Sequence, residues 1–195
     1  MRLPDTAHTG MPWRIHELTG DFRLEDVWAL PTPGGPDDFP QLVRLIASSG
    51  PSGRSAGVVR VLFAIRRRVG RAFGWDDRQP GRGAPTLRDR LPAQLRDAAA
   101  GPELGTLPFT PLYLLDDEFA AEAVNRTVHG VLHLGWVPDG AGGYRGQLAV
   151  IVKPHGLLGT GYLAAIRPLR HLIVYPSMLR EIGRAWRAGA KPQAA

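Results

Sequence analysis

The chain of 195 residues is long enough for one globular domain, and 44% hydrophobic and 22% charged residues exclude a wholly disordered protein. It has no cysteine, which excludes disulfides, thiolate zinc sites and a cysteine nucleophile. The net charge of +6 comes almost entirely from arginine, in a chain with 24 glycines and 18 prolines. We interpret this as the composition of a GC-rich genome, although basic charge still attracts acidic partners at long range, and we expect no specific nucleic-acid binding.

The N-terminal sequence lacks the apolar run of a signal peptide, and residues 1–10 are expected to form a loose leader. The most apolar stretch, residues 157–175, is interrupted by Arg167, Arg170 and His171, so no membrane span is predicted. We therefore expect a cytoplasmic protein. A single domain is predicted over 1–195, with its core at about 12–187 and flexible tails at 1–10 and 188–195.

The first hundred residues contain helix signals that are separated by turns. A mixed pattern up to residue 30 is followed by a turn of prolines and glycines at 31–36. A helix is predicted from about Asp37, because acidic residues and proline favour the first helical turn. In a second predicted helix, 57–73, arginines surround an apolar stripe, which indicates a solvated face, with phosphate binding as the alternative. A short irregular helix, broken by a proline, is predicted over 87–100.

From residue 109 the pattern changes to that of a sheet. Strands are predicted at about 109–115, at 118–137 with or without an internal break, and at 144–153. The glycine-rich residues 139–143 connect the last two strands as a hairpin. Apolar and polar residues alternate in the last strand, which is typical of an antiparallel sheet with one buried face.

The last part of the chain has the strongest periodicity. Apolar residues recur there at helical spacing, namely Leu158, Tyr162, Ile166, Leu169, Ile173, Ile182 and Trp186. Pro168 and Pro176 interrupt this stripe and are expected to kink or break the helix. The sequence therefore predicts an α+β domain, in which a long C-terminal helix from about Leu157 closes an antiparallel sheet.

Two short motifs in this half resemble functional signatures. Residues 159–164 match G-x-G-x-x-A, but a dinucleotide site needs a second parallel strand after the helix, and the chain has none there. His129 and His133 have the spacing of a metal pair on a helix. In a strand, however, they lie about 13 Å apart and on one face. We therefore expect no metal site, and we interpret the two histidines as polar residues of the less buried face or as pocket residues.

Glu122 is the carboxylate with the clearest chemical potential. It lies in the apolar stretch 119–124, a few residues before His129. It is either exposed on the outer face or partly buried with a shifted pKa, and a buried carboxylate is a candidate general acid or base. The catalytic candidates are Glu122, His129 and His133.

Several blocks of the sequence resemble a bacterial family catalogued as domain of unknown function 2867. The blocks are residues 13–16, 20–28, 125–129 and 170–176, and the resemblance extends over about 12–187. The segment from Lys153 is also similar to domains of the SRPBCC or Bet v 1-like helix-grip superfamily. This resemblance implies a curved antiparallel sheet that grips the C-terminal helix, with a cavity between them. It implies no established activity and no catalytic residue.

Three functions are compatible with these patterns. The first is non-covalent binding of a small apolar or amphipathic molecule between sheet and helix, by Tyr113, Trp136, Tyr162, Arg167 and His171. The second is a cyclase-, dehydratase- or hydrolase-like enzyme, in which Glu122 works with His129 or His133. The third is a module whose arginines bind acidic protein or nucleic acid. The cations at 167–171 either point to solvent, hold an anion or carboxylate, or contact anionic lipid.

Overall fold

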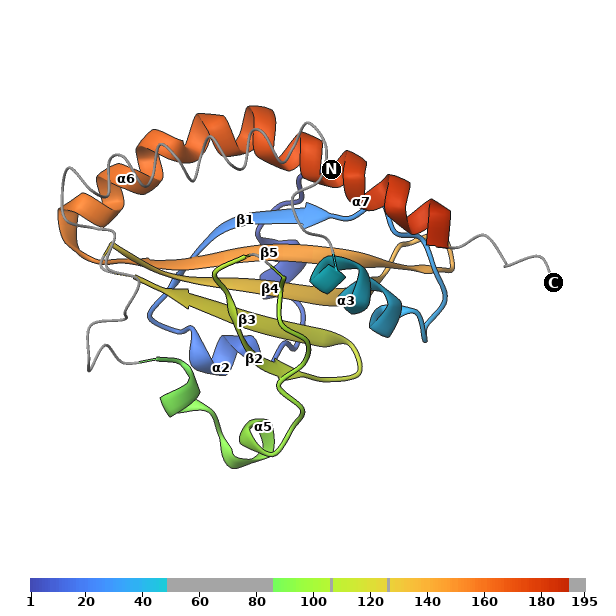
Figure 1. Cartoon of the computed structure of the whole chain (residues 1–195), viewed down its shortest axis with the longest axis horizontal. Helices are drawn as coiled ribbons and strands as arrows, with labels where there is room; N and C mark the ends of the chain where they lie inside the picture. The colour runs from blue at the N-terminus through green and yellow to red at the C-terminus, as the bar shows by residue number, and fades with distance from the viewer. Residues whose placement is uncertain (49–85, 106, 126, 190–195) are drawn as a thin grey trace.

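A computed structural model describes residues 1–48, 86–105, 107–125 and 127–189, without the side chains of Leu158 and Tyr162. Within this part of the chain, five strands form an antiparallel sheet in the order β1-β5-β4-β3-β2. The sheet is open and curved, and a long C-terminal helix crosses one of its faces (Figure 1). This confirms the predicted α+β class. The strands are β1 (Arg23–Ala29), β2 (Thr110–Leu114), β3 (Glu118–Val124), β4 (Val128–Pro138) and β5 (Tyr144–Pro154).

The predicted strand 118–137 is divided into β3 and β4 by a turn at Asn125. The Asn125 side-chain oxygen accepts hydrogen bonds from the backbone N–H groups of Thr127 (2.9 Å) and Val128 (3.0 Å). The Thr127 hydroxyl also donates to it, at 2.7 Å. Asparagine commonly stabilises turns in this way. The turn fixes the register of the hairpin, in which Val124 lies opposite His129.

The N-terminal residues are attached to the sheet, contrary to the expected loose leader. Arg2 forms a bridge with Trp28, and the Leu3 N–H donates to the Val27 carbonyl at 2.8 Å. Two short helices follow, α1 (Thr6–Thr9) and α2 (Ile15–Leu18). Both lie on the face of the sheet that is opposite the C-terminal helix, and the α1 residue His8 is buried.

The C-terminal helix has three parts, α6 (Gly156–Leu169), a π-helical turn η2 (Arg170–Val174) and α7 (Tyr175–Gly189). They form one continuous arch over the sheet (Figure 1). Pro168 lies just before the π turn, and Pro176 lies in the first turn of α7, where a missing N–H is tolerated.

The π turn changes which residues of this helix face the sheet. Ile173, expected on the buried stripe, is 40% exposed, whereas Tyr175, Ile182 and Trp186 are buried. A π turn contains more residues than an α turn and so rotates the following helix about its axis. The simple 3.6-residue periodicity was therefore wrong at Ile173.

The remaining predicted helices are shorter than expected or lie outside the described residues. Helix α3 (Phe39–Ser48) begins after Asp38, whose carboxylate accepts the Gly35 N–H at 2.8 Å. Residues 87–100 contain a 3-10 turn, η1 (Arg88–Arg90), and α5 (Ala93–Arg96). The predicted helix 57–73 and the end of the C-terminal tail fall outside the described residues. In the part of the chain that is described, no helix has the length and apolar character needed to cross a bilayer.

Side chains cover both faces of the sheet. The helix face packs a cluster that includes Phe39, Leu42, Leu134, Leu148 and Ile182. Four aromatic residues fill the centre of this interface, since Trp28 and Tyr175 lie 4.7 Å apart and Trp136 and Trp186 lie 6.0 Å apart between ring centroids. The opposite face packs a second cluster, composed of Trp13, Ile15, Leu18, Leu87, Leu91, Leu95, Leu112, Tyr113, Ala120, Val131, Val137 and Ile151.

Candidate acid–base site

Among the five residues predicted to bind one ligand, the structure describes the side chains of four, and these do not form one cluster. Tyr113 belongs to the cluster on the α1–α2 face, whereas Trp136 belongs to the cluster on the helix face. The Trp136 indole N–H donates to the Gly35 carbonyl, and Arg167 is exposed. His171 contacts β1, as described below, and the Tyr162 side chain lies outside the described residues. The sheet thus separates Tyr113 from Trp136.

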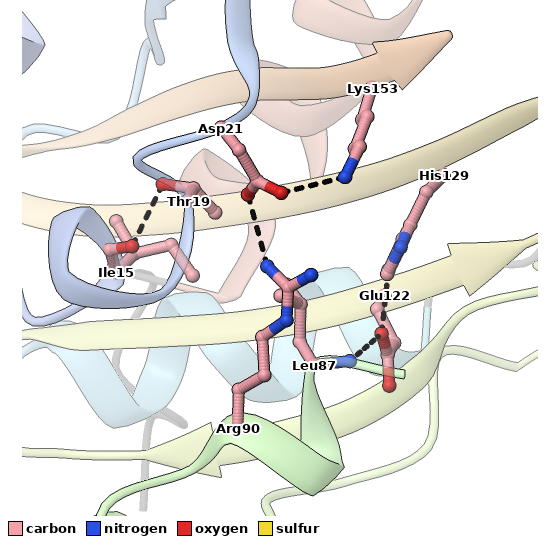
Figure 2. Close-up of polar contacts among 8 residues, drawn as sticks. All are labelled: Ile15, Thr19, Asp21, Leu87, Arg90, Glu122, His129 and Lys153. Atoms are coloured by element: carbon pink, nitrogen blue, oxygen red, sulfur yellow. Dashed lines mark hydrogen bonds and ion pairs between the residues drawn. The ribbon is translucent and has the colours of Figure 1, made fainter. Parts of the chain in front are cut away.

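The Glu122 and His129 side chains do meet. They project from neighbouring strands on the face that carries α1 and α2, and His129 Nε2 lies 2.7 Å from Glu122 Oε2 (Figure 2). The Leu87 backbone N–H donates to the same oxygen at 2.9 Å. Each of the two side chains is 6% exposed. The register set by the Asn125 turn brings this pair together, because it places Glu122 opposite Val131 and His129 opposite Val124.

The hydrogen bonds of this pair determine where the imidazole carries its proton. A carboxylate only accepts hydrogen bonds, so His129 donates its Nε2–H to Glu122. In a neutral ring, Nδ1 then keeps its lone pair. In the described part of the chain, neither His129 Nδ1 nor Glu122 Oε1 has a further hydrogen-bond partner. The carboxylate thus orients the imidazole and leaves one basic nitrogen uncommitted, which is the arrangement of a general base.

The surroundings of His129 combine an aromatic ring with charged groups. The Phe22 ring meets the imidazole edge-to-face at 4.9 Å. Lys153 and Arg90 hold Asp21 from two sides, at 2.6 Å and 3.0 Å (Figure 2). These hydrogen bonds lower the pKa of Asp21 to about 2. Asp21 therefore stays ionised and keeps both cations beside Phe22, where Lys153 lies 5.9 Å from the ring centroid.

A second carboxylate–imidazole pair, Glu118 and His133, lies on the same two strands and is enclosed. His133 Nε2 lies 2.9 Å from Glu118 Oε2, and both side chains are at most 2% exposed. Tyr113 donates its hydroxyl to the same oxygen at 3.3 Å, and the Arg14 N–H donates to the other oxygen at 2.9 Å. Burial and then the Glu118 charge raise the pKa of Tyr113, which stays protonated as a donor.

Two N-terminal histidines extend this second pair into a chain. His133 Nδ1 lies 3.2 Å from His8 Nε2, and His8 Nδ1 lies 3.2 Å from His16 Nε2. Because Glu118 accepts from His133, a neutral His133 must accept from His8, which in turn accepts from His16. Burial, followed by the charges of His133 and His16, lowers the pKa of His8 to about 3. His8 is therefore uncharged, and both nitrogens of His133 and of His8 are occupied by hydrogen bonds.

A third polar cluster ties the C-terminal helix to β1. The fully buried Asp26 accepts the Tyr175 hydroxyl at 2.9 Å, and Arg170 lies 3.3 Å from the same carboxylate oxygen. His171 Nε2 lies 2.8 Å from the other oxygen, in an orientation that does not make a hydrogen bond. Arg170 also pairs with Glu25 at 3.1 Å. Arg170 and His171 thus lie against carboxylates of the protein itself, whereas Arg167 is exposed.

Comparison with known families identifies the chain. The family model described as "Protein of unknown function (DUF2867)" matches residues 18–177. The chain belongs to the DUF2867 family. The comparisons with curated proteins and with solved structures give no match.

The blocks that carry the resemblance to DUF2867 are far apart in sequence but adjacent in the fold. Asp26 and Trp28 of the second block contact Tyr175 of the last block. Phe22 of the second block contacts His129 of the third block. The second block therefore contacts the last block on one face of the sheet and the third block on the other.

Sequence reasoning did not find Asp26, Glu118, His8 or His16 in this DUF2867 domain. Each is a polar residue whose partner lies at least eight residues away in the chain. Among the described residues, no group of three or more His, Cys, Asp and Glu side chains is placed to hold a metal ion.

Proposed function

We propose that this DUF2867 domain acts on a small molecule by acid–base chemistry at the Glu122–His129 pair. The observation that carries the proposal is the 2.7 Å contact between the two side chains, with the Leu87 N–H on the same carboxylate oxygen. In this reading His129 Nδ1 takes a proton from the substrate or from water. Glu122 holds the tautomer and stabilises the imidazolium that forms.

The contrast with the second pair supports the choice of His129 over His133. Both nitrogens of His133 are hydrogen-bonded inside the protein, so this ring has no lone pair for a substrate. The His129 side chain has the same carboxylate support but makes only one hydrogen bond within the described residues. The first pair is suited to chemistry and the second to holding the N-terminal segment on the sheet.

The position of the pair indicates the substrate class. Phe22 offers an aromatic surface beside the imidazole, and Lys153 and Arg90 lie next to it. Apolar surface with a few convergent polar groups is typical of sites for small organic molecules. We propose a small amphipathic substrate with an anionic or polar group toward Lys153.

We further propose that the domain is related to helix-grip folds, as its curved antiparallel sheet and closing C-terminal helix support. We place the ligand, however, beside Glu122 and His129, on the face of the sheet opposite the C-terminal helix. Trp28, Tyr175, Trp136 and Trp186 already pack the centre of the sheet–helix interface.

The proposal is tested with p-nitrophenyl acetate, an activated ester whose hydrolysis reports a reactive imidazole. The rate due to the protein is expected to fall about 100-fold in His129→Gln, which is the lower range for loss of a general base. Glu122→Gln is expected to lower the rate as well, because the imidazole loses its negative partner. The exposed neighbour His155 provides the matched control, and His155→Gln should retain the wild-type rate.

A spectroscopic readout separates loss of chemistry from loss of fold. Nitrogen NMR of the histidine rings is expected to show His129 as the Nε2–H tautomer in the wild-type protein, and Glu122→Gln should shift its tautomer ratio. Wild-type hydrolysis in a folded His129→Gln variant would contradict the proposal. So would a His129 ring that carries its proton on Nδ1.

A further inference from the structure

The outer face of the C-terminal helix is divided into an apolar part and a cationic part. The inner face is buried on the sheet through Leu163, Tyr175, Ile182 and Trp186. Exposed residues occur in two stretches of the arch that Figure 1 shows, at 157–173 and at 180–189, and residues 174–179 between them are at most half-exposed. We call this surface the outer helix face. It is formed by the exposed residues Leu157, Gly161, Ala164, Ala165, Arg167, Pro168, Leu172, Ile173, Arg180, Arg184 and Arg187.

The α6–η2 part of the outer helix face is mostly apolar, apart from the exposed Arg167. Leu157 is 90% exposed, Leu172 is 76% exposed and Ile173 is 40% exposed. Gly161, the alanines and Pro168 lie between the two leucines at helical spacing. Single exposed apolar residues are ordinary, but a continuous apolar stripe on a helix marks an interaction surface.

The α7 part of the outer helix face is cationic and has no internal counter-charge. Arg180, Arg184 and Arg187 are exposed and follow one another at spacings of four and three residues. In the described residues none of them pairs with a carboxylate, although Arg23, Arg90 and Arg170 do. Arg180 and Arg184 donate to the neutral oxygens of Pro176, Ser177 and Arg180, so in the described residues the three guanidinium charges have no carboxylate partner.

We propose that the outer helix face docks on the surface of an anionic lipid bilayer. A bilayer interface satisfies both parts at once, because acyl chains receive the leucines and headgroup phosphates receive the arginines. A nucleic acid would bind the arginines but offers no apolar surface to Leu157 and Leu172. A second copy of the chain would bury unpaired arginines against apolar residues or against each other, which is unfavourable.

Cosedimentation of the full chain with lipid vesicles tests this inference. Vesicles of phosphatidylcholine with 30% phosphatidylglycerol are compared with vesicles of phosphatidylcholine alone. The protein is expected to partition onto the anionic vesicles and to be released by salt. The triple variant R180Q/R184Q/R187Q should partition on the order of 100-fold more weakly, since each cation contributes a factor of about five near an anionic surface. L157S/L172S should lose at least tenfold at unchanged charge.

A second triple variant controls for total charge. R44Q/R88Q/R96Q removes three other exposed arginines that have no ion pair in the described residues. It should keep nearly all of the vesicle binding. Equal loss in both triple variants would overturn the proposal, because binding would then follow net charge alone. Wild-type binding by L157S/L172S, or no binding of the wild type to anionic vesicles, would overturn it too. So would loss of duplex DNA binding in R180Q/R184Q/R187Q without any vesicle binding.

Discussion

Replacing His8 by glutamine is expected to remove part of the acid sensitivity of the fold. His8 is 1% exposed and its pKa is lowered to about 3, first by burial and then by the neighbouring His133 and His16. An unfolded histidine takes its proton near pH 6.5. Between these two values the unfolded chain binds a proton that the folded chain does not, so falling pH favours unfolding. The contribution of His8 is complete above pH 6.5 and is lost as the pH falls toward 3.

The size of the effect follows from the two pKa values. Below pH 6.5 the free energy of unfolding falls by about 1.4 kcal/mol for each pH unit. Between pH 7.5 and 5.0 the loss due to His8 is therefore about 2 kcal/mol. Carboxylates elsewhere add to the total acid sensitivity of the wild type. The difference in slope between wild type and His8→Gln isolates the histidine, because glutamine still offers an N–H to His133 but takes no proton.

Urea unfolding followed by tryptophan fluorescence at several pH values between 7.5 and 5.0 measures this slope. The His8→Gln variant is expected to be less stable at pH 7.5, because its fit to His133 and His16 is poorer. Its stability should then decline less steeply as the pH falls. If wild type and variant lose the same free energy from pH 7.5 to 5.0, His8 is not a buried neutral histidine and the reasoning fails.

Two further substitutions probe packing and the helix cluster. Tyr175→Phe should lower the free energy of unfolding by about 1–3 kcal/mol, because Asp26 loses its hydroxyl donor. In the control Tyr144→Phe no side-chain hydrogen bond within the described residues is lost, and the free energy of unfolding should change by less than about 0.5 kcal/mol. Equal effects of the two substitutions would show that the Tyr175–Asp26 hydrogen bond does not stabilise the fold. Gly135→Ala places a methyl group 2.6 Å from the Trp13 ring, so thermal melting should show a loss of about 1–3 kcal/mol, and an unchanged melting temperature would contradict this contact.

The sheet residues that sequence could predict are those with a regular pattern. Residues 144–153 alternate apolar and polar side chains after a glycine-rich turn, and β5 forms there. β1 was missed because Glu25 and Asp26 break its alternation. Asp26 is buried only because Arg170 and Tyr175, almost 150 residues later, satisfy it. No local pattern contains that information.

The candidate site shows the same division between local and distant information. Glu122 and His129 could be named as acid–base candidates from their residue types and apolar surroundings. Their pairing with each other, and that of His133 with Glu118, depends on the hairpin register set by Asn125. The contact of His133 with His8 requires the N-terminal segment to dock on the sheet, which separate residue patterns do not reveal.

The attachment of the N-terminal residues also protects the sheet from self-association. An edge strand with free N–H and C=O groups is a template on which another molecule can add a strand. At the β1 edge, the Val27 carbonyl and the Ala29 N–H are already bonded to Leu3 and Met1. At the β2 edge, Pro111 has no N–H to offer, and the pairing with β3 is irregular beside it. Both margins of the open sheet are thus unsuited to joining a second sheet, so the domain can keep two free sheet edges without forming β-linked polymers.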